Sequence, residues 1–227
     1  MEDLILSNDE LDTETVNESA CPAAPCSPSL DLRLADCVDV MREAPDNHWN
    51  LAIVDPPYGI ERFQKKGSIM SNAFDLAKWD KRPNSEYWAE LMRVSENQIV
   101  WGGNYFGLPP TKHFVFWHKL DAAPSFAKGE MAWSSFDRPA AYWSSAIEKS
   151  KCHPCQKPIK LYAWLLDQYA KPGQRILDTH MGSGSIAIAC HYFGAHLTAC
   201  EIDEEYYNTA CERIERETRQ MELPLFS

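Results

Sequence analysis

Residues 178–185, Asp-Thr-His-Met-Gly-Ser-Gly-Ser, form a glycine loop between an expected strand at 175–177 and a helical pattern at 185–193. Gly182, Gly184 and Ala187 fit the spacing G-x-G-x-x-[G/A], and Glu201 ends the next expected strand 19 residues after Gly182. In α/β sheets such glycines let a nucleoside approach the backbone, while the acidic residue accepts ribose hydroxyls. The loop therefore predicts an α/β fold with a nucleoside site. A purely structural turn is the alternative.

The position of this loop narrows the choice of ligand. Only 43 residues follow Gly184, which is enough for one more strand and one more helix. A dinucleotide dehydrogenase begins with such a loop and builds most of its sheet afterwards, whereas here the sheet must be completed by upstream strands. Asp178 also suits a cationic ligand better than a pyrophosphate. S-adenosylmethionine, a sulfonium with an amino-acid tail, is the expected cofactor, and NAD is the alternative.

A second motif, Asp55-Pro56-Pro57-Tyr58, directly follows the apolar run Leu51–Val54. Proline fixes φ near −65° and has no N–H. The two prolines therefore hold the carbonyls of Asp55 and Pro56 in a preset direction. We predict an acceptor-rich pocket with an aromatic ring, suited to the –NH2 group of a flat base. A plain proline turn after a strand is the alternative.

Strands and helices are expected to alternate along the chain, which predicts a mostly parallel α/β sheet. The strand pair within 113–133 should add an antiparallel edge, and the long polar segment 60–83 should be a functional loop. Trp133, Tyr142 and Trp143 are expected to be core residues rather than base-stacking platforms. The expected strands are 31–36, 51–54, 98–101, 113–118, 129–133, 139–143, 175–177 and 196–200, and the expected helices are 37–44, 84–94, 158–170, 185–193 and 203–219.

Charge is unevenly distributed along the 227 residues. Residues 1–30 contain seven acidic residues and no Lys or Arg, so we expect a disordered acidic tail there, a single domain over 31–219 and a C-terminal tail at 220–227. The net charge is −11, yet residues 48–200 hold 17 basic and 13 acidic residues. The basic clusters in this stretch would suit a phosphate backbone, and an ordinary solvated surface is the alternative; for a nucleic-acid ligand, we expect the loops 60–83 and 134–151 to make the contacts. The candidate DNA-binding residues are Arg62, Lys65, Lys66, Lys78, Lys81 and Arg82.

The eight cysteines form no recognisable framework. Cys37, Cys190, Cys200 and Cys211 fall in expected helices and strands, which is typical of free thiols in a reducing cytoplasm. Cys152 and Cys155 have C-x-x-C spacing, but no second Cys/His pair is present at the spacing of a zinc site, so no metal is expected.

No apolar run is long enough for a membrane span, and the N-terminus lacks the pattern of a signal peptide.

With both motifs placed, the chain resembles the DNA methyltransferases that act on the exocyclic amine of adenine (N6) or cytosine (N4). The order of the motifs, with Asp55–Tyr58 before the glycine loop, resembles the circularly permuted β-type of that family. His153-Pro-Cys-Gln156-Lys157-Pro158 resembles the family's H-P-x-Q-K-P segment. Trp101-Gly-Gly-Asn104-Tyr-Phe resembles compact enzymes of phages and mobile elements. His180 stands where the family loop often has Phe, and no large separate target-recognition domain is visible.

The resemblance implies a Rossmann-like, S-adenosylmethionine-dependent methyltransferase fold. It implies that Asp55 and the Pro56 carbonyl orient the target amine, that Pro57 stiffens the turn and that Tyr58 stacks on a flipped base. Lys157 is expected to meet the cofactor carboxylate, and Asp36 and Cys37 its adenine edge. The implied cofactor-binding residues are Asp36, Cys37, His153, Gln156, Lys157, Asp178, Thr179, His180, Met181, Gly182, Ser183, Gly184, Ser185, Glu201, Ile202 and Asp203.

The implied reaction is methylation of adenine N6 in double-stranded DNA after base flipping, in the cytoplasm of a bacterium or a phage-infected host cell. The leading Asp of the catalytic motif is the form usually associated with adenine. Cytosine N4, an RNA substrate and a catalytically inactive nucleic-acid-binding protein of the same fold are the alternatives. Enzymes with the permuted arrangement often form homodimers. The sequence does not reveal the recognition site or a restriction endonuclease partner.

Overall fold

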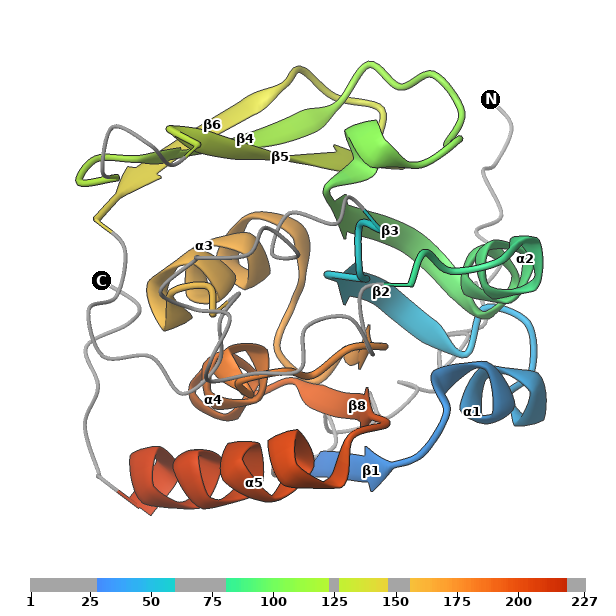
Figure 1. The fold of residues 1–227 in the computed structure, drawn as a ribbon, viewed down its shortest axis with the longest axis vertical. Coiled ribbons are helices and arrows are strands. Elements are labelled where there is room, and N and C mark those ends of the chain that lie inside the picture. The colour runs from blue at the N-terminus through green and yellow to red at the C-terminus, as the bar shows by residue number, and fades with distance from the viewer. Residues whose placement is uncertain (1–27, 60–80, 123–126, 147–155, 220–227) are drawn as a thin grey trace, which may run out of the picture.

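The computed structural model describes residues 28–59, 81–122, 127–146 and 156–219. Their strands and helices alternate as expected, with boundaries within a few residues of the predicted ones (Figure 1). The elements are β1 (Leu30–Leu34), α1 (Cys37–Glu43), β2 (Trp49–Val54), α2 (Ser85–Val94), β3 (Ser95–Trp101), the 3-10 turn η1 (Gly103–Tyr105), β4 (Phe114–Lys119), β5 (Gly129–Ser134), β6 (Ala141–Ser145), α3 (Ile159–Tyr169), β7 (Arg175–Asp178), α4 (Ser185–Phe193), β8 (His196–Glu201) and α5 (Glu204–Arg219).

The described strands form one mixed sheet in the order β1-β8-β7-β2-β3-β5-β4-β6. The five strands from β1 to β3 are parallel, whereas β5 is antiparallel to both β3 and β4. The expected α/β sheet with an antiparallel hairpin is therefore confirmed. The hairpin does not form the edge itself, however, because β6 pairs outside β4 in a parallel direction.

Helices cover both faces of the sheet, with α1 and α2 on one side and α3, α4 and α5 on the other (Figure 1). Side chains of β2 alternate between the two faces, as a pleated strand requires. Leu51 and Ile53 pack in the core beneath α3 and α4, while Ala52 and Val54 pack with α1 and α2. A strand buried on both faces reads as a continuous apolar run, which is why residues 51–54 could be recognised from the sequence.

Polar side chains cap the first turns of three helices. Asp36 accepts a hydrogen bond from the Val38 N–H at 2.8 Å and caps α1. Asn84 caps α2 by accepting from the Tyr87 N–H at 2.9 Å, and Asp203 accepts from Glu205 and Tyr206 at the start of α5. These caps satisfy amide groups that have no partner inside the helix. The helices α1 and α5 begin within three residues of the ends of β1 and β8.

Several sequence predictions fall outside the described residues. They concern most of the acidic tail, the segments 60–80 and 147–155, and the C-terminal residues 220–227. At the boundary of the tail, β1 begins at Leu30, one residue before the expected start of the domain. In the described part of the chain, no helix combines the length and apolar character needed to cross a membrane.

Candidate active site

The polar ends of the parallel strands meet at one edge of the sheet. Asp36 follows β1, Glu201 ends β8, Asp178 ends β7, Asp55 follows β2 and Gly102 follows β3. These strands are consecutive neighbours in the sheet. Ligands of open α/β sheets bind outside the carboxyl ends of the strands. The two motifs recognised in the sequence therefore lie next to each other in the structure.

The Asp55–Tyr58 turn is held by contacts within itself and with η1. The Tyr58 hydroxyl donates to Asp55 Oδ1 at 2.8 Å, and Pro56 is buried. The Tyr58 ring stacks on Tyr105, with centroids 5.0 Å apart and planes inclined by 21°. Gly102 has φ +66°, and a Cβ built there would lie 2.3 Å from the Tyr58 ring. The Gly102–Gly103 segment thus allows two aromatic rings to meet beside the Asp55 carboxylate.

Lys157 lies against this turn. Its ammonium forms an ion pair with Asp55 Oδ2 and lies 3.3 Å from Glu130 Oε2. It also lies over the Trp101 ring, 5.1 Å from the centroid. The sequence indicated Lys157 as a contact of the cofactor carboxylate and did not indicate Glu130 at all. The alternation of side chains along β5 could have indicated Glu130, because it places the Glu130 carboxylate on the same face of the strand as buried Ala132.

The glycine loop is organised by the backbone and by Glu201. Glu201 Oε2 accepts from the Gly182 N–H at 3.0 Å, while Oε1 accepts from the N–H groups of Ile202 and Asp203. Gly184 has φ +73°, and a Cβ there would lie 2.7 Å from Ile214. A carboxylate has about four acceptor positions. Glu201 can therefore hold the loop and still accept hydroxyl groups of a ligand.

Buried Arg213 supports the other end of the loop and was missed in the sequence, because its place in the helical pattern of α5 does not reveal its partners. It donates to the Ser183 carbonyl at 2.7 Å and to Ser185 Oγ at 2.9 Å. A buried guanidinium that donates to the loop restricts its conformations. The loop conformation is thus fixed from α5 as well as from β8.

Burial shifts the pKa values of Asp178 and His180 toward their neutral forms. Burial raises the pKa of Asp178 to about 7, against the opposing effect of the His180 N–H that donates to its Oδ1 at 3.0 Å. Nearby Asp55 and Glu201 raise this pKa further. Burial lowers the pKa of His180 to about 4. A cationic ligand at this edge would favour the ionised form of Asp178.

A pH-dependent stability follows for the ligand-free protein. Folded Asp178 keeps its proton up to about pH 7, whereas an unfolded Asp releases it near pH 4. The folded state therefore binds more protons between these values, so Asp178 makes the free energy of unfolding fall as pH rises. We expect Asp178→Asn to remove about 2–4 kcal/mol of this loss. Urea unfolding of the wild type and of Asp178→Asn, each at pH 4.5 and at pH 8, measures this effect. If the free energy of unfolding changes by the same amount between the two pH values in both proteins, the prediction is contradicted.

The remaining candidates around the cofactor loop take several roles. Thr179 shares a hydrogen bond with the buried Tyr87 hydroxyl at 2.7 Å, and Met181 is buried. Cys37 is half-buried in α1, where burial raises the pKa of its thiol. Gln156 is buried immediately before Lys157, and Ile202 is exposed. His153 lies outside the described residues.

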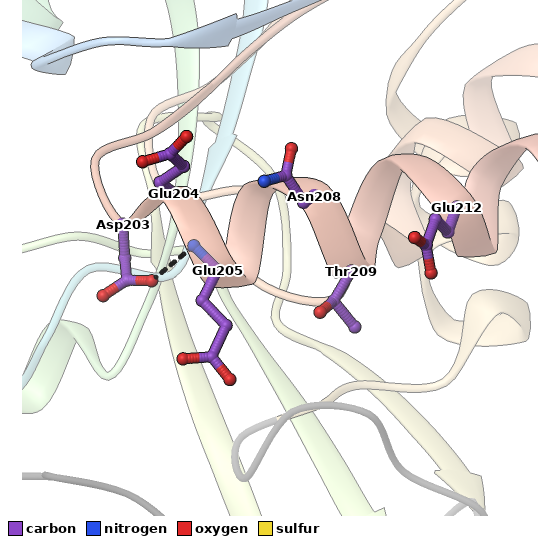
Figure 2. A pocket seen from close by; sticks show the side chains of 6 residues that line it. All are labelled: Asp203, Glu204, Glu205, Asn208, Thr209 and Glu212. Carbon is purple, nitrogen blue, oxygen red and sulfur yellow. Dashed lines mark hydrogen bonds between the residues drawn. The ribbon is translucent and has the colours of Figure 1, made fainter.

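Beyond Glu201, the start of α5 forms an acidic surface depression. Asp203, Glu204, Glu205 and Glu212 line it together with Asn208 and Thr209 (Figure 2). Figure 2 also shows Asp203 used as the helix cap, bonded to the Glu205 N–H at 3.0 Å. Four carboxylates make this surface unfavourable for a phosphate backbone. In the described part of the chain no group of His, Cys, Asp and Glu has the arrangement of a metal site.

The structure describes two of the candidate DNA-binding residues. Lys81 is exposed, and Arg82 donates from Nε to the Tyr58 carbonyl at 2.8 Å. Arg82 thus ties the end of the 60–83 segment to the catalytic turn. The other four, Arg62, Lys65, Lys66 and Lys78, lie outside the described residues.

The expectation that Tyr142 is a core residue is wrong. Tyr142 is 61% exposed and stacks on Phe116, because no helix of the described residues covers this face of the outer strands (Figure 1). Trp143 points to the opposite face and packs against Trp164 of α3. Trp133 is half-buried against the core beneath α1 and α2.

Comparisons with known proteins agree with this arrangement. The N6/N4 methyltransferase family model, described as DNA methylase, matches residues 121–212. The Escherichia coli K12 protein named "Putative methylase YubD" is 24% identical over 82% of this chain and 91% of its own length.

Two solved structures share the fold. The SAM complex of M1.HpyAVI has a TM-score of 0.55 and 21% identity, over 81% of this chain and 99% of that one. The cytosine-N4-specific PvuII DNA methyltransferase has a TM-score of 0.60 and 14% identity, over 86% of this chain and 93% of that one.

The sheet and its two motif-bearing strand ends thus define an α/β protein with the fold of the S-adenosylmethionine-dependent DNA methyltransferases. Within that fold, residues 121–212 are similar to the N6/N4 DNA methylases, and most of the chain is similar to a protein named as a putative methylase.

Proposed function

We propose that the chain transfers a methyl group from S-adenosylmethionine to the N6 amine of adenine in DNA. The observation that carries this proposal is the placement of the two motifs on neighbouring strands. Asp55 follows β2, and the glycine loop leaves β7, which is hydrogen-bonded to β2. An amine held at the first site therefore lies beside a nucleoside held at the second. The SAM complex of the structural relative M1.HpyAVI supports the choice of cofactor.

The residues of the second site fit the proposed cofactor. Glu201 has the position and the acceptor capacity for ribose hydroxyls, and the carboxyl of Asp178 suits a positively charged group. Asp36 and Cys37 lie at the neighbouring end of β1, where an adenine edge would be read. When bound, S-adenosylmethionine supplies a methyl group on a positively charged sulfur. The protein's part is to place an amine in line with that methyl group.

Asp55 and the Pro56 carbonyl would orient the amine. The lone pair of an exocyclic amine is delocalised into the ring, so the nitrogen is a poor nucleophile. Acceptors for both N–H groups turn the lone pair toward the methyl group and stabilise the positive charge that develops on nitrogen. Preorganised acceptors of this kind contribute about 3–4 kcal/mol in other enzymes.

The aromatic rings would hold a base outside the duplex. An amine inside stacked DNA cannot reach Asp55, so the target nucleotide has to flip out at a cost of a few kcal/mol. Tyr58 is already paired with Tyr105, and Phe106 meets its edge at 6.2 Å. Stacking on Tyr58 would offset part of the unstacking cost. Arg82, bonded to the Tyr58 carbonyl, would place a cation close to the backbone of a bound DNA.

Gly102 gives a test of this aromatic site. An alanine at φ +66° is strained by about 1–2 kcal/mol, and its Cβ would collide with the Tyr58 ring. We expect Gly102→Ala to shift Tyr58 and reduce methyl transfer by about 100-fold, because small displacements near the reacting groups are costly. Steady-state kinetics with duplex DNA measure this. Gly107→Ala is a control, because a Cβ there meets nothing within 4 Å. Equal rates for both variants would contradict the prediction.

Cytosine N4 is the second candidate target, favoured by the structural similarity to the PvuII enzyme. The same acceptor pair can orient either amine, and the leading Asp favours adenine through the family resemblance. Radiolabelled S-adenosylmethionine incubated with duplex DNA or with RNA tests the substrate class. We expect label in DNA and none in RNA. Label in neither would favour the alternative of an inactive nucleic-acid-binding protein.

A further inference from the structure

Four charged side chains form a continuous chain that ends on the catalytic motif. Lys119 on β4 pairs with Glu130 Oε1 on β5, and Glu130 Oε2 lies 3.3 Å from the Lys157 ammonium. Lys157 in turn pairs with Asp55 Oδ2. The network therefore connects the antiparallel hairpin β4–β5 to the carboxylate expected to receive the target amine.

Burial makes the partners of Lys157 important. The Lys157 side chain is 3% exposed, and the carboxylates of Asp55 and Glu130 are 17% and 21% exposed. A charge removed from water is tolerated only where opposite charges and hydrogen bonds compensate. Burial raises the pKa of Glu130, but Lys157 and Lys119 lower it more, to about 2. Glu130 is therefore an anion throughout the physiological range and holds Lys157 by charge as well as by contact.

The position of Glu130 is fixed by the sheet rather than by a loop. β5 pairs with β3, where Ala132 faces Trp101, and with β4, where Glu130 faces Trp117. The Trp101 ring lies beneath the Lys157 ammonium. Sites carried by strands hold their groups more precisely than sites carried by loops. Glu130 therefore offers Lys157 a second anchor, carried by a strand, in addition to Asp55.

We propose that Glu130 is a positioning residue that acts through Lys157 to fix the orientation of the Asp55 carboxylate. This inference rests on the proposed function of the Asp55 site. With Oδ2 held by Lys157 and Oδ1 bonded to the Tyr58 hydroxyl, the plane of the carboxylate is set before the base arrives. Lys157 has a long, flexible side chain, and without Glu130 its ammonium loses the contact that keeps it directed at Asp55. The Asp55 carboxylate then loses its alignment with the incoming amine.

The test compares Glu130→Gln with wild type in kinetics and in cofactor binding. Glutamine keeps the size of the side chain and removes its charge. We expect kcat to fall about 10- to 100-fold, with the calorimetric Kd for S-adenosylmethionine changed less than about threefold. Glu96→Gln is the matched control. It makes the same change near the start of β3, at the end of the strand opposite to Trp101. Its kcat should equal that of wild type.

A second measurement follows Lys157 without relying on activity. Brief labelling with trace acetic anhydride, read by peptide mass spectrometry, reports how readily the Lys157 amine reacts. Loss of the Glu130 charge weakens the hold on the ammonium form. We therefore expect Lys157 to label several-fold faster in Glu130→Gln and at the wild-type rate in Glu96→Gln. If Glu130→Gln does not fold, Glu130→Asp keeps the charge, draws the carboxylate back by one methylene and should also lower kcat.

The possible failures are distinguishable. Wild-type kcat and wild-type labelling in the folded Glu130 variants would overturn the inference while leaving the proposed function intact. An effect confined to the Kd for S-adenosylmethionine would also overturn it and would return Lys157 to the cofactor carboxylate. A wild-type protein that methylates no DNA would overturn the proposed function, while the labelling would still report whether Glu130 holds Lys157.

Discussion

Replacing Asp55 by alanine is expected to reduce methyl transfer to DNA by about 1,000-fold or more. The substitution removes the carboxylate that would orient the amine and meet its developing charge. The glycine loop and Glu201 lie on β7 and β8 and do not depend on Asp55 for their hydrogen bonds. Cofactor binding should therefore persist. Single-turnover kinetics and calorimetry with S-adenosylmethionine separate the two effects.

Asp55→Asn is the matched variant for this prediction. It keeps the size of the side chain and one acceptor oxygen, but it removes the charge paired with Lys157. We expect a rate between those of wild type and Asp55→Ala. Urea unfolding checks that both variants fold, because the loss of one charged partner of a buried lysine is destabilising. Full activity in Asp55→Ala would remove Asp55 from the reaction.

Replacing Glu201 by glutamine is expected to weaken cofactor binding by about 100-fold, equivalent to about 2.7 kcal/mol. Both Glu201 oxygens accept backbone N–H groups, from Gly182, Ile202 and Asp203. An amide has one acceptor oxygen, so its –NH2 group would face donors and the loop would lose contacts. The same substitution would remove the carboxylate proposed to accept the ribose hydroxyls of the cofactor. Buried unmatched donors cost about 1–3 kcal/mol each.

Calorimetry with S-adenosylmethionine measures the effect of Glu201→Gln, and urea unfolding gives the stability change separately. Glu204→Gln, at the exposed start of α5, is a suitable control because it removes one nearby negative charge. An unchanged Kd in Glu201→Gln would contradict the assignment of the ribose site.

Local patterns explain how much of the fold could be predicted from the sequence. The apolar run Leu51–Val54 and the spacing from Gly182 to Glu201 can be recognised within short stretches of sequence. The Asp55–Tyr58 motif and the glycine loop both lie at the expected strand ends. Parallel strands place their carboxyl ends at one edge, so the proximity of Asp55 to the glycine loop followed from the fold class. The caps that Asn84 and Asp203 form are local as well, because each accepts from a backbone N–H two or three residues away.

The parts that could not be predicted depend on contacts between distant segments. Glu130 and Lys157 are separated by the whole of β6 and meet only because β5 pairs with β3. The exposure of Tyr142 depends on which face of the outer strands the helices of the described residues cover, and alternation alone does not reveal this. The pairing of β6 outside the hairpin is equally nonlocal.

The most direct test is to identify the methylated nucleoside. Duplex DNA of mixed sequence is incubated with the purified protein and methyl-labelled S-adenosylmethionine, digested to nucleosides and separated by chromatography with mass spectrometry. We expect labelled N6-methyladenine that is present with wild type and absent with Asp55→Ala. Labelled N4-methylcytosine would contradict the adenine assignment. No labelled nucleoside, from a folded protein that binds S-adenosylmethionine, would contradict the proposal that this site methylates DNA.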